Sequence, residues 1–217
     1  ALVLFLGVRA FVVEAFQIPT GSMKSTLMPG DFLLVNKAVY GAEIPGTDWH
    51  LPELDDPGVG DVVVFRPPPT AGQPADARYV KRVVGAPGDT LAMRDGTLWR
   101  NGRPVDESYA VHLEGWEEPV SSRFGWQERY LVGDAARRES YRATRNDWGP
   151  LAVPPDSFFV MGDNRDNSED SRYWGFVPRE AITGSPLFIY FSYDRDGRAS
   201  RSWMPEVRWG RLFERVR

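Results

Sequence analysis

The sequence contains no cysteine among its 217 residues. This absence excludes a thiol nucleophile, a disulfide framework and a cysteine-based zinc site, and it leaves the redox compartment undecided. Histidine is also scarce, since His50 and His112 are the only two and lie far apart in the chain. A multi-histidine metal centre is therefore not expected, and a histidine-based serine triad would have to recruit one of these two side chains.

A surplus of positive charge is also lacking, because the formal net charge is -4 at pH 7. This balance provides no general basic surface for nucleic acid. The chain length favours one domain, or one domain with a large insertion. The 21 glycines and 18 prolines favour many short strands over long helices, so we predict a mostly β fold.

No apolar run reaches the length of about 20 residues that a membrane-spanning helix needs. Residues 1–16 are nevertheless strongly apolar apart from Arg9 and Glu14. We interpret residues 1–15 as the outer part of a membrane helix whose beginning is missing. Three alternatives remain open: a signal-peptide core, although Arg9 interrupts it, an amphipathic helix lying on a membrane, and a buried core helix.

A turn rich in hydroxyl groups follows the apolar segment. It contains Thr20, Ser22, Ser25 and Thr26 among prolines and glycines, and a strand is predicted at residues 31–37. A reactive serine needs a sharp turn, free backbone amides and a rigid strand behind it. Taken alone, this stretch is better explained as an ordinary solvent-exposed loop than as a catalytic turn. A catalytic interpretation therefore requires a general base from elsewhere in the chain.

Lys81 is a candidate for that base. It lies in a predicted strand at residues 78–84, where alternation places it on the same face as Tyr79 and Val83. Its aliphatic stem could cover apolar surface while the ammonium group stays in water, which is the simpler interpretation of this stretch alone. Alternatively, burial of the amine would lower its pKa and make a base available near neutral pH.

The remaining chain alternates between strand-like and irregular stretches. Asp95-Gly96 and Asn101-Gly102 predict hairpin turns. Residues 103–153 carry many charges and scattered tryptophans, and we interpret them as an inserted subdomain. Further strands are predicted at residues 61–65, 157–161 and 187–193. The basic tail that follows could touch anionic lipid headgroups or, equally well, be a solvated end with two packed tryptophans.

An acidic loop extends from Gly162 to Gly175. It does not fit a calcium-binding loop, because Ser168 stands where glycine is needed and Trp174 where a bidentate glutamate is needed. It is either an ordinary solvated loop or one whose interleaved Arg, Asp, Asn and Ser side chains fix its shape beside a site.

Three stretches, at residues 16–37, 79–89 and 162–175, are distinguished by the order and spacing of their Gly, Pro, Ser, Lys and Asp residues. Together they resemble the bacterial type I signal peptidases, also called leader peptidases. Members of this family are membrane-anchored serine proteases that cut signal peptides from exported proteins. The order and spacing of the stretches and the preceding apolar segment all agree, whereas residues 103–153 show no family motif. The matching stretches are Phe16-x-Ile-Pro-Thr-Gly-Ser-Met23 with Gly30-Asp31 and Val35-x-Lys37, Tyr79-Val-Lys-Arg-Val-Val-Gly-x-Pro-Gly-Asp89, and Gly162-Asp-Asn-Arg-Asp-Asn-Ser-x-Asp-Ser-Arg-x-Trp-Gly175.

The resemblance implies a role for each matching residue. Ser22 would be the nucleophile and Lys81 the general base, which explains why no histidine is needed. The Ser22 backbone N–H and the Thr20 hydroxyl would form the oxyanion hole. Ser168 would orient the Lys81 amine.

Supporting and substrate-binding residues follow from the same resemblance. Asp170 and Arg172 would form an ion pair that holds the acidic loop in place. Shallow apolar pockets near Ser22 would accept small side chains, although a residue of this kind is by itself more often ordinary core. The positions that match such pockets are Phe16, Ile18, Leu27, Leu33 and Val80.

The chain departs from the family pattern at two positions. Ser25 stands where the family commonly has proline, and Thr20 where serine is commoner. The turn is therefore expected to be less rigid, while the Thr20 hydroxyl can still donate. Lys24 lies two residues from Ser22 and could be mistaken for the base, but we expect it to be exposed.

The resemblance implies an antiparallel, barrel-like catalytic core with an inserted β-rich subdomain and an N-terminal membrane helix. The expected division is a membrane anchor at 1–15, a catalytic core at 16–102 and 154–217, and the insertion at 103–153. The implied function is removal of signal peptides after an Ala-x-Ala-like site through an acyl-enzyme, on the outer face of the bacterial cytoplasmic membrane. Preproteins and the lipid bilayer are the expected partners, with no cofactor, metal, nucleic acid or obligate protein partner.

Two alternatives to this function remain. One is a self-cleaving Ser/Lys protease domain of the repressor type, which would lack the apolar segment and the acidic loop. The other is an inactive membrane-anchored β module that binds peptides by strand addition.

Overall fold

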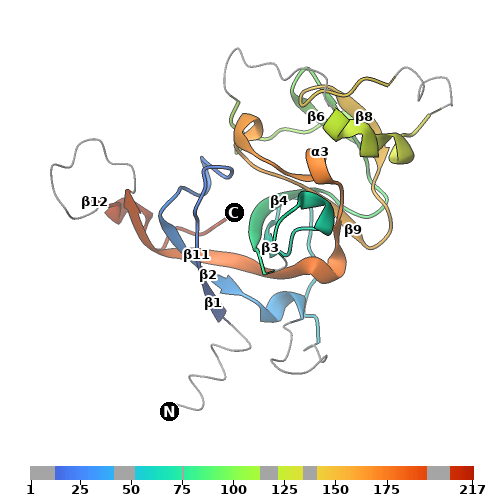
Figure 1. Cartoon of the computed structure of the whole chain (residues 1–217). Helices are drawn as coiled ribbons and strands as arrows, with labels where there is room; N and C mark the ends of the chain where they lie inside the picture. Colours follow the sequence, from blue (N-terminus) through green and yellow to red (C-terminus); the bar gives the residue numbers. More distant parts are fainter. Residues whose placement is uncertain (1–12, 42–51, 75, 113–121, 134–140, 195–205) are drawn as a thin grey trace.

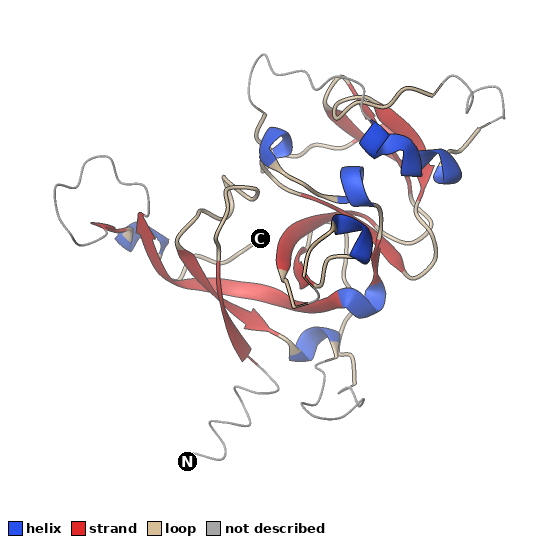
Figure 2. Cartoon of the chain, viewed as in Figure 1, coloured by secondary structure: helices blue, strands red, loops and turns tan. Residues whose placement is uncertain are grey.

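Strands dominate the structure, which is a computed structural model (Figures 1 and 2). It describes residues 13–41, 52–74, 76–112, 122–133, 141–194 and 206–217. The strands are β1 (Val13–Gln17), β2 (Asp31–Asn36), β3 (Val62–Phe65), β4 (Tyr79–Gly85), β5 (Thr90–Arg94), β6 (Thr97–Arg100), β7 (Arg103–Pro104), β8 (Trp148–Ala152), β9 (Ser157–Met161), β10 (Val177–Pro178), β11 (Ile182–Asp194) and β12 (Glu206–Val207). The helical turns are α3 (Ser171–Trp174) and the 3-10 helices η1 (Ala38–Tyr40), η2 (Pro69–Ala71), η3 (Ser122–Tyr130), η4 (Arg165–Asn167), η5 (Arg179–Ala181) and η6 (Trp209–Arg211).

The first sheet is antiparallel and has the strand order β1-β2-β11-β3-β4-β9-β10, with β12 paired to β11. Its centre is apolar because β3 is buried along its whole length and β2 buries every second residue. The strand β11 pairs with β2 along most of its length and with β3 at its start. Its register shifts twice against β2 and once against β3. Such irregularities bend a strand, and the sheet is strongly curved at β3 and β4 (Figure 1).

The second sheet has the order β7-β6-β5-β8. Two predicted hairpin turns connect its strands and are confirmed. The φ angles are 47° at Asp95 and 74° at Gly96 in the first turn, and 53° at Asn101 and 76° at Gly102 in the second. Tight hairpin turns require such positive values. The sheet takes strands from both sides of the expected boundary at residue 102, because β5 and β6 precede it and β8 lies in the predicted insertion.

Both sheets and the covering helices share apolar contacts. Trp148 of β8 stacks on Phe159 of β9 with ring centroids 5.2 Å apart. Phe124 of η3 lies 5.3 Å from the ring of Tyr173 in α3. These contacts belong to one buried cluster that extends from β3 to β8, so the position of the second sheet is fixed by core packing. The prediction of a mostly β, antiparallel fold is confirmed.

The N-terminal prediction requires a correction at residues 13–15. These residues were expected in a membrane anchor, but they begin β1, which pairs antiparallel with β2 from Val13 opposite Asn36 to Gln17 opposite Phe32. The strand pairs with the edge of β2, and a helix at residues 13–15 would leave the backbone groups of that edge without these partners. The rest of the predicted anchor, residues 1–12, lies outside the described residues. Within the described ranges, none of the helices has the length and apolar character of a membrane span.

The C-terminal segment, residues 206–217, folds back onto the turn that contains Ser22. Arg211 forms an ion pair with the fully buried Asp31 at 2.8 Å and donates to the Thr26 carbonyl at 2.9 Å. Arg208 donates to the Pro29 carbonyl. The tail was considered as a headgroup contact, but these two arginines bind within the protein instead.

Candidate active site

Ser22 lies in a closed loop whose ends are joined by backbone hydrogen bonds. The Ile18 N–H donates to the Asp31 carbonyl at 2.8 Å, and the Gly30 N–H donates to the Ile18 carbonyl at 3.0 Å. Met23 and Leu27 anchor the loop from inside, with 1% and 0% of their surface exposed. The loop therefore presents Ser22 from a firmly packed base.

Ser25 has a backbone conformation that proline cannot adopt. Its φ angle is 101°, whereas the proline ring fixes φ near −65°. Its hydroxyl donates to the Tyr109 carbonyl at 2.6 Å. At position 25, where the signal peptidases that the sequence resembles commonly have proline, the turn is therefore held by a hydrogen bond to the segment that follows β7.

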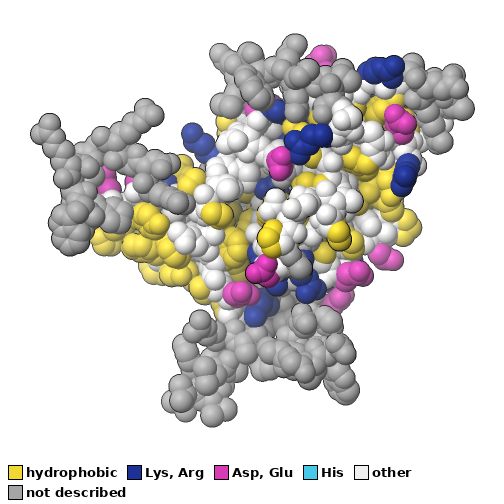
Figure 3. Space-filling model, in the orientation of Figure 1, with side chains coloured by type: hydrophobic (Ala, Val, Ile, Leu, Met, Phe, Trp, Pro, Cys, Tyr) yellow, Lys and Arg dark blue, Asp and Glu magenta, His cyan; other side chains and the backbone are white. Residues whose placement is uncertain are grey.

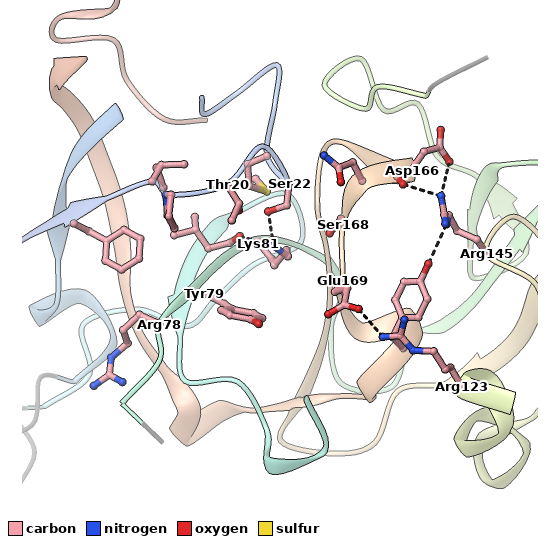
Figure 4. A pocket seen from close by; sticks show the side chains of 17 residues that line it. Thr20, Ser22, Arg78, Tyr79, Lys81, Arg123, Arg145, Asp166, Ser168 and Glu169 are labelled. Atoms are coloured by element: carbon pink, nitrogen blue, oxygen red, sulfur yellow. Dashed lines mark hydrogen bonds and ion pairs between the residues drawn. The ribbon is translucent and has the colours of Figure 1, made fainter. Parts of the chain in front are cut away.

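Lys81 of β4 reaches Ser22 across the cleft (Figure 4). Its Nζ lies 2.7 Å from Ser22 Oγ and 3.2 Å from the Val80 carbonyl oxygen. The side chain is 5% exposed, and this burial lowers the pKa of Lys81 to about 8, although the nearby carboxylates Asp170 and Asp163 act in the opposite direction. Of the two interpretations of Lys81, the desolvated amine agrees with its position.

Lys24 does not compete for this position. Its side chain is exposed, as expected, and its backbone N–H donates to the Gly21 carbonyl within the turn.

Arg82, the neighbour of Lys81, connects three parts of the site. Its guanidinium donates to both carboxylate oxygens of Asp163 at 2.9 and 2.7 Å, and Thr26 donates to the same carboxylate at 2.5 Å. The ring of Tyr109 lies 3.9 Å from the guanidinium carbon. Arg82 and Asp163 are both nearly inaccessible to solvent, so this network ties β4 to the serine turn and the acidic loop. Nothing local in the sequence indicates that Asp163 is the partner of Arg82.

The acidic loop is internally bonded. Asp170 and Arg172 form a fully buried ion pair at 2.8 Å, and Asp170 also accepts from the Gly162 N–H at 3.1 Å. Burial alone would raise the pKa of Asp170, but the adjacent Arg172 guanidinium holds that pKa below its usual value. Arg165 binds Glu107 through two hydrogen bonds of 2.6 and 2.7 Å. The interpretation as an ordinary solvated loop is therefore wrong.

Ser168 is buried beside the same cleft, at 7% exposure. Its hydroxyl faces the buried Asp170 and, after the Arg172 guanidinium and the Gly162 N–H, helps to hold the pKa of that carboxyl below its usual value. A Cβ on Gly162 would collide with this hydroxyl and with the Ser22 carbonyl oxygen, so glycine permits the acidic loop to approach the serine turn. The orientation of Lys81 by Ser168 stays a prediction.

A cleft of about 430 Å³ runs past Ser22 and Lys81. Three of the predicted substrate-binding residues, Phe16, Ile18 and Val80, line it, and so does the exposed Thr20. The other two, Leu27 and Leu33, are fully buried in the core beneath it and do not line the cleft. This position agrees with the alternative of ordinary core residues, and a role of Leu27 and Leu33 in substrate binding stays a prediction.

The opposite end of the cleft contains residues that the sequence did not suggest. Arg123, Arg145 and Tyr173 line it together with Asp166 and Glu169 of the acidic loop. The two arginines belong to the predicted insertion, where no motif was recognised. No local sequence signal could have found them, because the position of Arg123 depends on how η3 packs against α3, and that of Arg145 on its hydrogen bonds to Tyr173 and Asp166.

The arrangement around Ser22 suits nucleophilic catalysis. A hydroxyl and an amine of lowered pKa lie within hydrogen-bond distance at the floor of a cleft, beside a second hydroxyl from Thr20 (Figure 4). Such a pair can transfer a proton while the hydroxyl attacks a carbonyl group.

Comparisons with known proteins point to one family. The family described as signal peptidase, peptidase S26, matches residues 1–191. A signal peptidase I of Pseudomonas fluorescens is 42% identical over 205 residues, covering 88% of this chain and 69% of the relative. The signal peptidase I of Pseudomonas aeruginosa is 41% identical over 208 residues, with the same coverage. A crystal structure of a signal peptidase I from Enterococcus faecalis V583 aligns with 60% of this chain and 97% of that chain, at 28% identity and a TM-score of 0.39.

Proposed function

This chain belongs to the signal peptidase family, peptidase S26, and from that premise we propose that it removes signal peptides from exported preproteins with Ser22 as nucleophile and Lys81 as general base. One observation supports these roles above all: Lys81 Nζ lies 2.7 Å from Ser22 Oγ, and burial lowers the pKa of that amine to about 8. A substantial fraction of the amine is therefore neutral near physiological pH and able to accept a proton.

In the first half of the reaction, Ser22 Oγ attacks the carbonyl carbon of the scissile peptide bond while Lys81 Nζ takes the hydroxyl proton. Charge develops on the carbonyl oxygen, and the Ser22 backbone N–H and the Thr20 hydroxyl would donate to it. The tetrahedral intermediate collapses when the C–N bond breaks. Lys81 then gives its proton to the leaving amine, which becomes the new N-terminus of the mature protein.

In the second half, a water molecule replaces the leaving amine. Lys81, neutral again, takes a proton from this water as its oxygen attacks the acyl-enzyme carbonyl. Collapse of the second intermediate breaks the bond to Ser22 Oγ and returns the proton to it. The signal peptide leaves with a free carboxylate, and both catalytic residues are restored.

The apolar end of the cleft supports the expected preference for small side chains before the cleaved bond. Phe16, Ile18 and Val80 line this end, and Ile18 and Val80 are almost fully buried, which leaves shallow apolar surface. Small residues in an Ala-x-Ala-like pattern would fit there, whereas larger ones would have to displace packed core residues.

Exposed aromatic and apolar residues support a location at a membrane surface. The exposed fractions are 38% for Tyr190 and Phe191 of β11, and 73% for Trp209 and Phe213 of the C-terminal segment. Apolar side chains gather on the face over β11 near β12 (Figure 3). Such patches favour contact with lipid or protein. We place the catalytic part on the outer face of the bacterial cytoplasmic membrane, where substrate and enzyme share a surface and their local concentration rises.

The roles of Ser22 and Lys81 are tested with two matched pairs of variants and a preprotein in lipid vesicles. Ser22→Ala should abolish cleavage, while Thr97→Ala removes an exposed hydroxyl of β6 and should cleave normally. Lys81→Ala should also abolish cleavage, whereas Lys24→Ala removes an exposed amine two positions from Ser22 and should retain it. Each loss should exceed about a thousandfold in turnover.

Three results would contradict this function. Cleavage by Ser22→Ala would remove Ser22 as the nucleophile. A wild-type chain that cuts only itself would favour the repressor-type alternative. A wild-type chain that binds signal peptides but never cuts them would favour the inactive peptide-binding module.

A further inference from the structure

The cleft has two chemically different ends, with the Ser22–Lys81 pair between them. Phe16, Ile18 and Val80 make one end largely apolar, and Arg78 also lines the cleft on that side (Figure 4). Glu169 and Arg123 lie at the other end, so that Lys81 stands between them and the apolar residues (Figure 4). A peptide that places its small side chains in the apolar end must direct the residues after the cleaved bond toward the charged end.

Arg123 is held at this end by the docking of η3 on α3. The Trp126 and Gln127 side chains both donate to the Arg172 carbonyl, at 3.0 and 3.1 Å. The guanidinium carbon of Arg123 lies 4.4 Å from the centre of the Tyr173 ring. The stacking fixes the position of the charge while half of the side chain remains exposed.

Glu169 meets Arg123 from the acidic loop. Its Oε1 lies 2.7 Å from Arg123 Nη2, and 57% of its side chain is exposed. It follows Ser168 and precedes Asp170, which are both buried, so its backbone is fixed at the cleft wall. An exposed ion pair contributes little to stability, and either partner can exchange it for a charged ligand.

The second arginine at this end is differently placed. Arg145 is 5% exposed, and its guanidinium donates to the Tyr173 hydroxyl at 3.0 Å and to the Asp166 carbonyl at 2.7 Å. A guanidinium fixed by buried partners cannot turn toward a substrate without breaking them. At this end of the cleft, the charges accessible to a passing peptide are therefore those of Arg123 and Glu169, whereas Arg78 lines the cleft on the other side of Lys81 (Figure 4).

We propose that Arg123 and Glu169 form a charge-sensing subsite for the residues of the preprotein that follow the cleaved bond. The proposal rests on the proposed function and adds a determinant of specificity to it. Because each charge compensates the other, the wild-type enzyme discriminates little between acidic and basic residues there. When one of the two charges is removed, the remaining one attracts preprotein residues of opposite charge and repels those of the same charge.

The test uses matched preproteins with Gln, Lys or Asp at each of the first few positions after the cleavage site. The measured quantity is the ratio of kcat/KM for the Lys substrate to that for the Asp substrate. Arg123→Gln should raise this ratio about threefold to fivefold because Glu169 is uncompensated, and Glu169→Gln should lower it by a similar factor. The double variant should return the ratio to near the wild-type value, and added salt should shrink both shifts.

Arg129→Gln and Glu128→Gln are the controls, because both exposed residues belong to η3 but do not line the cleft. Arg129→Gln changes the net charge as Arg123→Gln does, and Glu128→Gln changes it as Glu169→Gln does. Both controls should leave the ratio of kcat/KM values unchanged. If the ratios did not shift, or shifted in the same direction in both single variants, the subsite would be overturned. Cleavage of the Gln substrate in that case would still support the proposed function. A wild-type enzyme that cut none of the substrates would overturn both.

Discussion

At the residue scale, Lys81 must be both buried and able to accept a proton. Burial lowers its pKa to about 8, while Asp170, Asp163 and Glu169 raise it toward the ordinary lysine value. The group is a base only when it is neutral, and its neutral fraction increases as the pH rises through its pKa.

We therefore expect kcat/KM to rise with pH along a limb whose midpoint lies near 8, in contrast to the 10.5 of an unperturbed lysine. The measurement is a pH–rate profile on a preprotein without titrating groups near the cleavage site. Glu169→Gln should move the limb to lower pH because it removes a charge that favours the ammonium form. A limb near 10 or above would contradict a desolvated base.

At the scale of elements, the serine turn is held by contacts from distant parts of the chain. The segment after β7 reaches it through the bond between Ser25 Oγ and the Tyr109 carbonyl. The same segment continues to Val111, whose N–H donates to the Asp163 carbonyl at 2.8 Å. One piece of chain thus contacts both the nucleophile turn and the start of the acidic loop.

Three substitutions of Ser25 separate its backbone conformation from its hydrogen bond. Ser25→Gly accommodates the φ of 101° but loses the hydroxyl, so kcat should fall several-fold while thermal stability is kept. Ser25→Ala also loses the hydroxyl and retains the strain. Ser25→Pro cannot adopt this φ and should cost about 3 kcal/mol in unfolding free energy.

The measurements are turnover kinetics and thermal unfolding of the same preparations. If Ser25→Pro were as stable and active as the wild type, the turn would not need the conformation seen here. If Ser25→Gly kept full turnover, the bond to Tyr109 would have no role in positioning Ser22.

Elements with a strong local signal could be predicted from the sequence. The strand expected at 157–161 is β9 itself. The strand expected at 61–65 begins one residue before β3, and the strand expected at 78–84 is displaced by one residue from β4 at both ends. Each is a short apolar run bounded by glycine or proline, which suits a buried strand and little else. The hairpin turns were predictable because Asp-Gly and Asn-Gly tolerate positive φ angles.

Features that depend on tertiary packing could not be predicted. Residues 13–17 show no regular burial alternation, so β1 is defined only by its pairing with β2. Likewise, nothing local indicates that Arg211 binds the buried Asp31 or that Arg123 reaches the cleft. The candidate site was found through the resemblance of its motifs, whereas its charged end lies in a segment without a motif.

At the scale of the whole molecule, a buried lysine lowers the free energy of unfolding over a defined pH range. Above pH 10.5 the amine is neutral in both the folded and the unfolded chain, and no penalty arises. As the pH falls toward 8, the unfolded chain takes up a proton that the folded protein does not, so stability decreases. Below about 8 both states are protonated, and the penalty stays constant at roughly 3 kcal/mol, which corresponds to the pKa difference.

Lys81→Met should therefore be more stable than the wild type at pH 7, by roughly 2 to 3 kcal/mol, although it cannot cleave. The difference should diminish as the pH rises from 8 to 10.5 and vanish above that, because the neutral amine costs little to bury. Urea unfolding at several pH values measures it, and Lys24→Met, at an exposed position, should show no such pH-dependent gain. A Lys81→Met protein that is less stable at every pH would mean that the amine stabilises the fold, and the lowered pKa would then lose its physical basis.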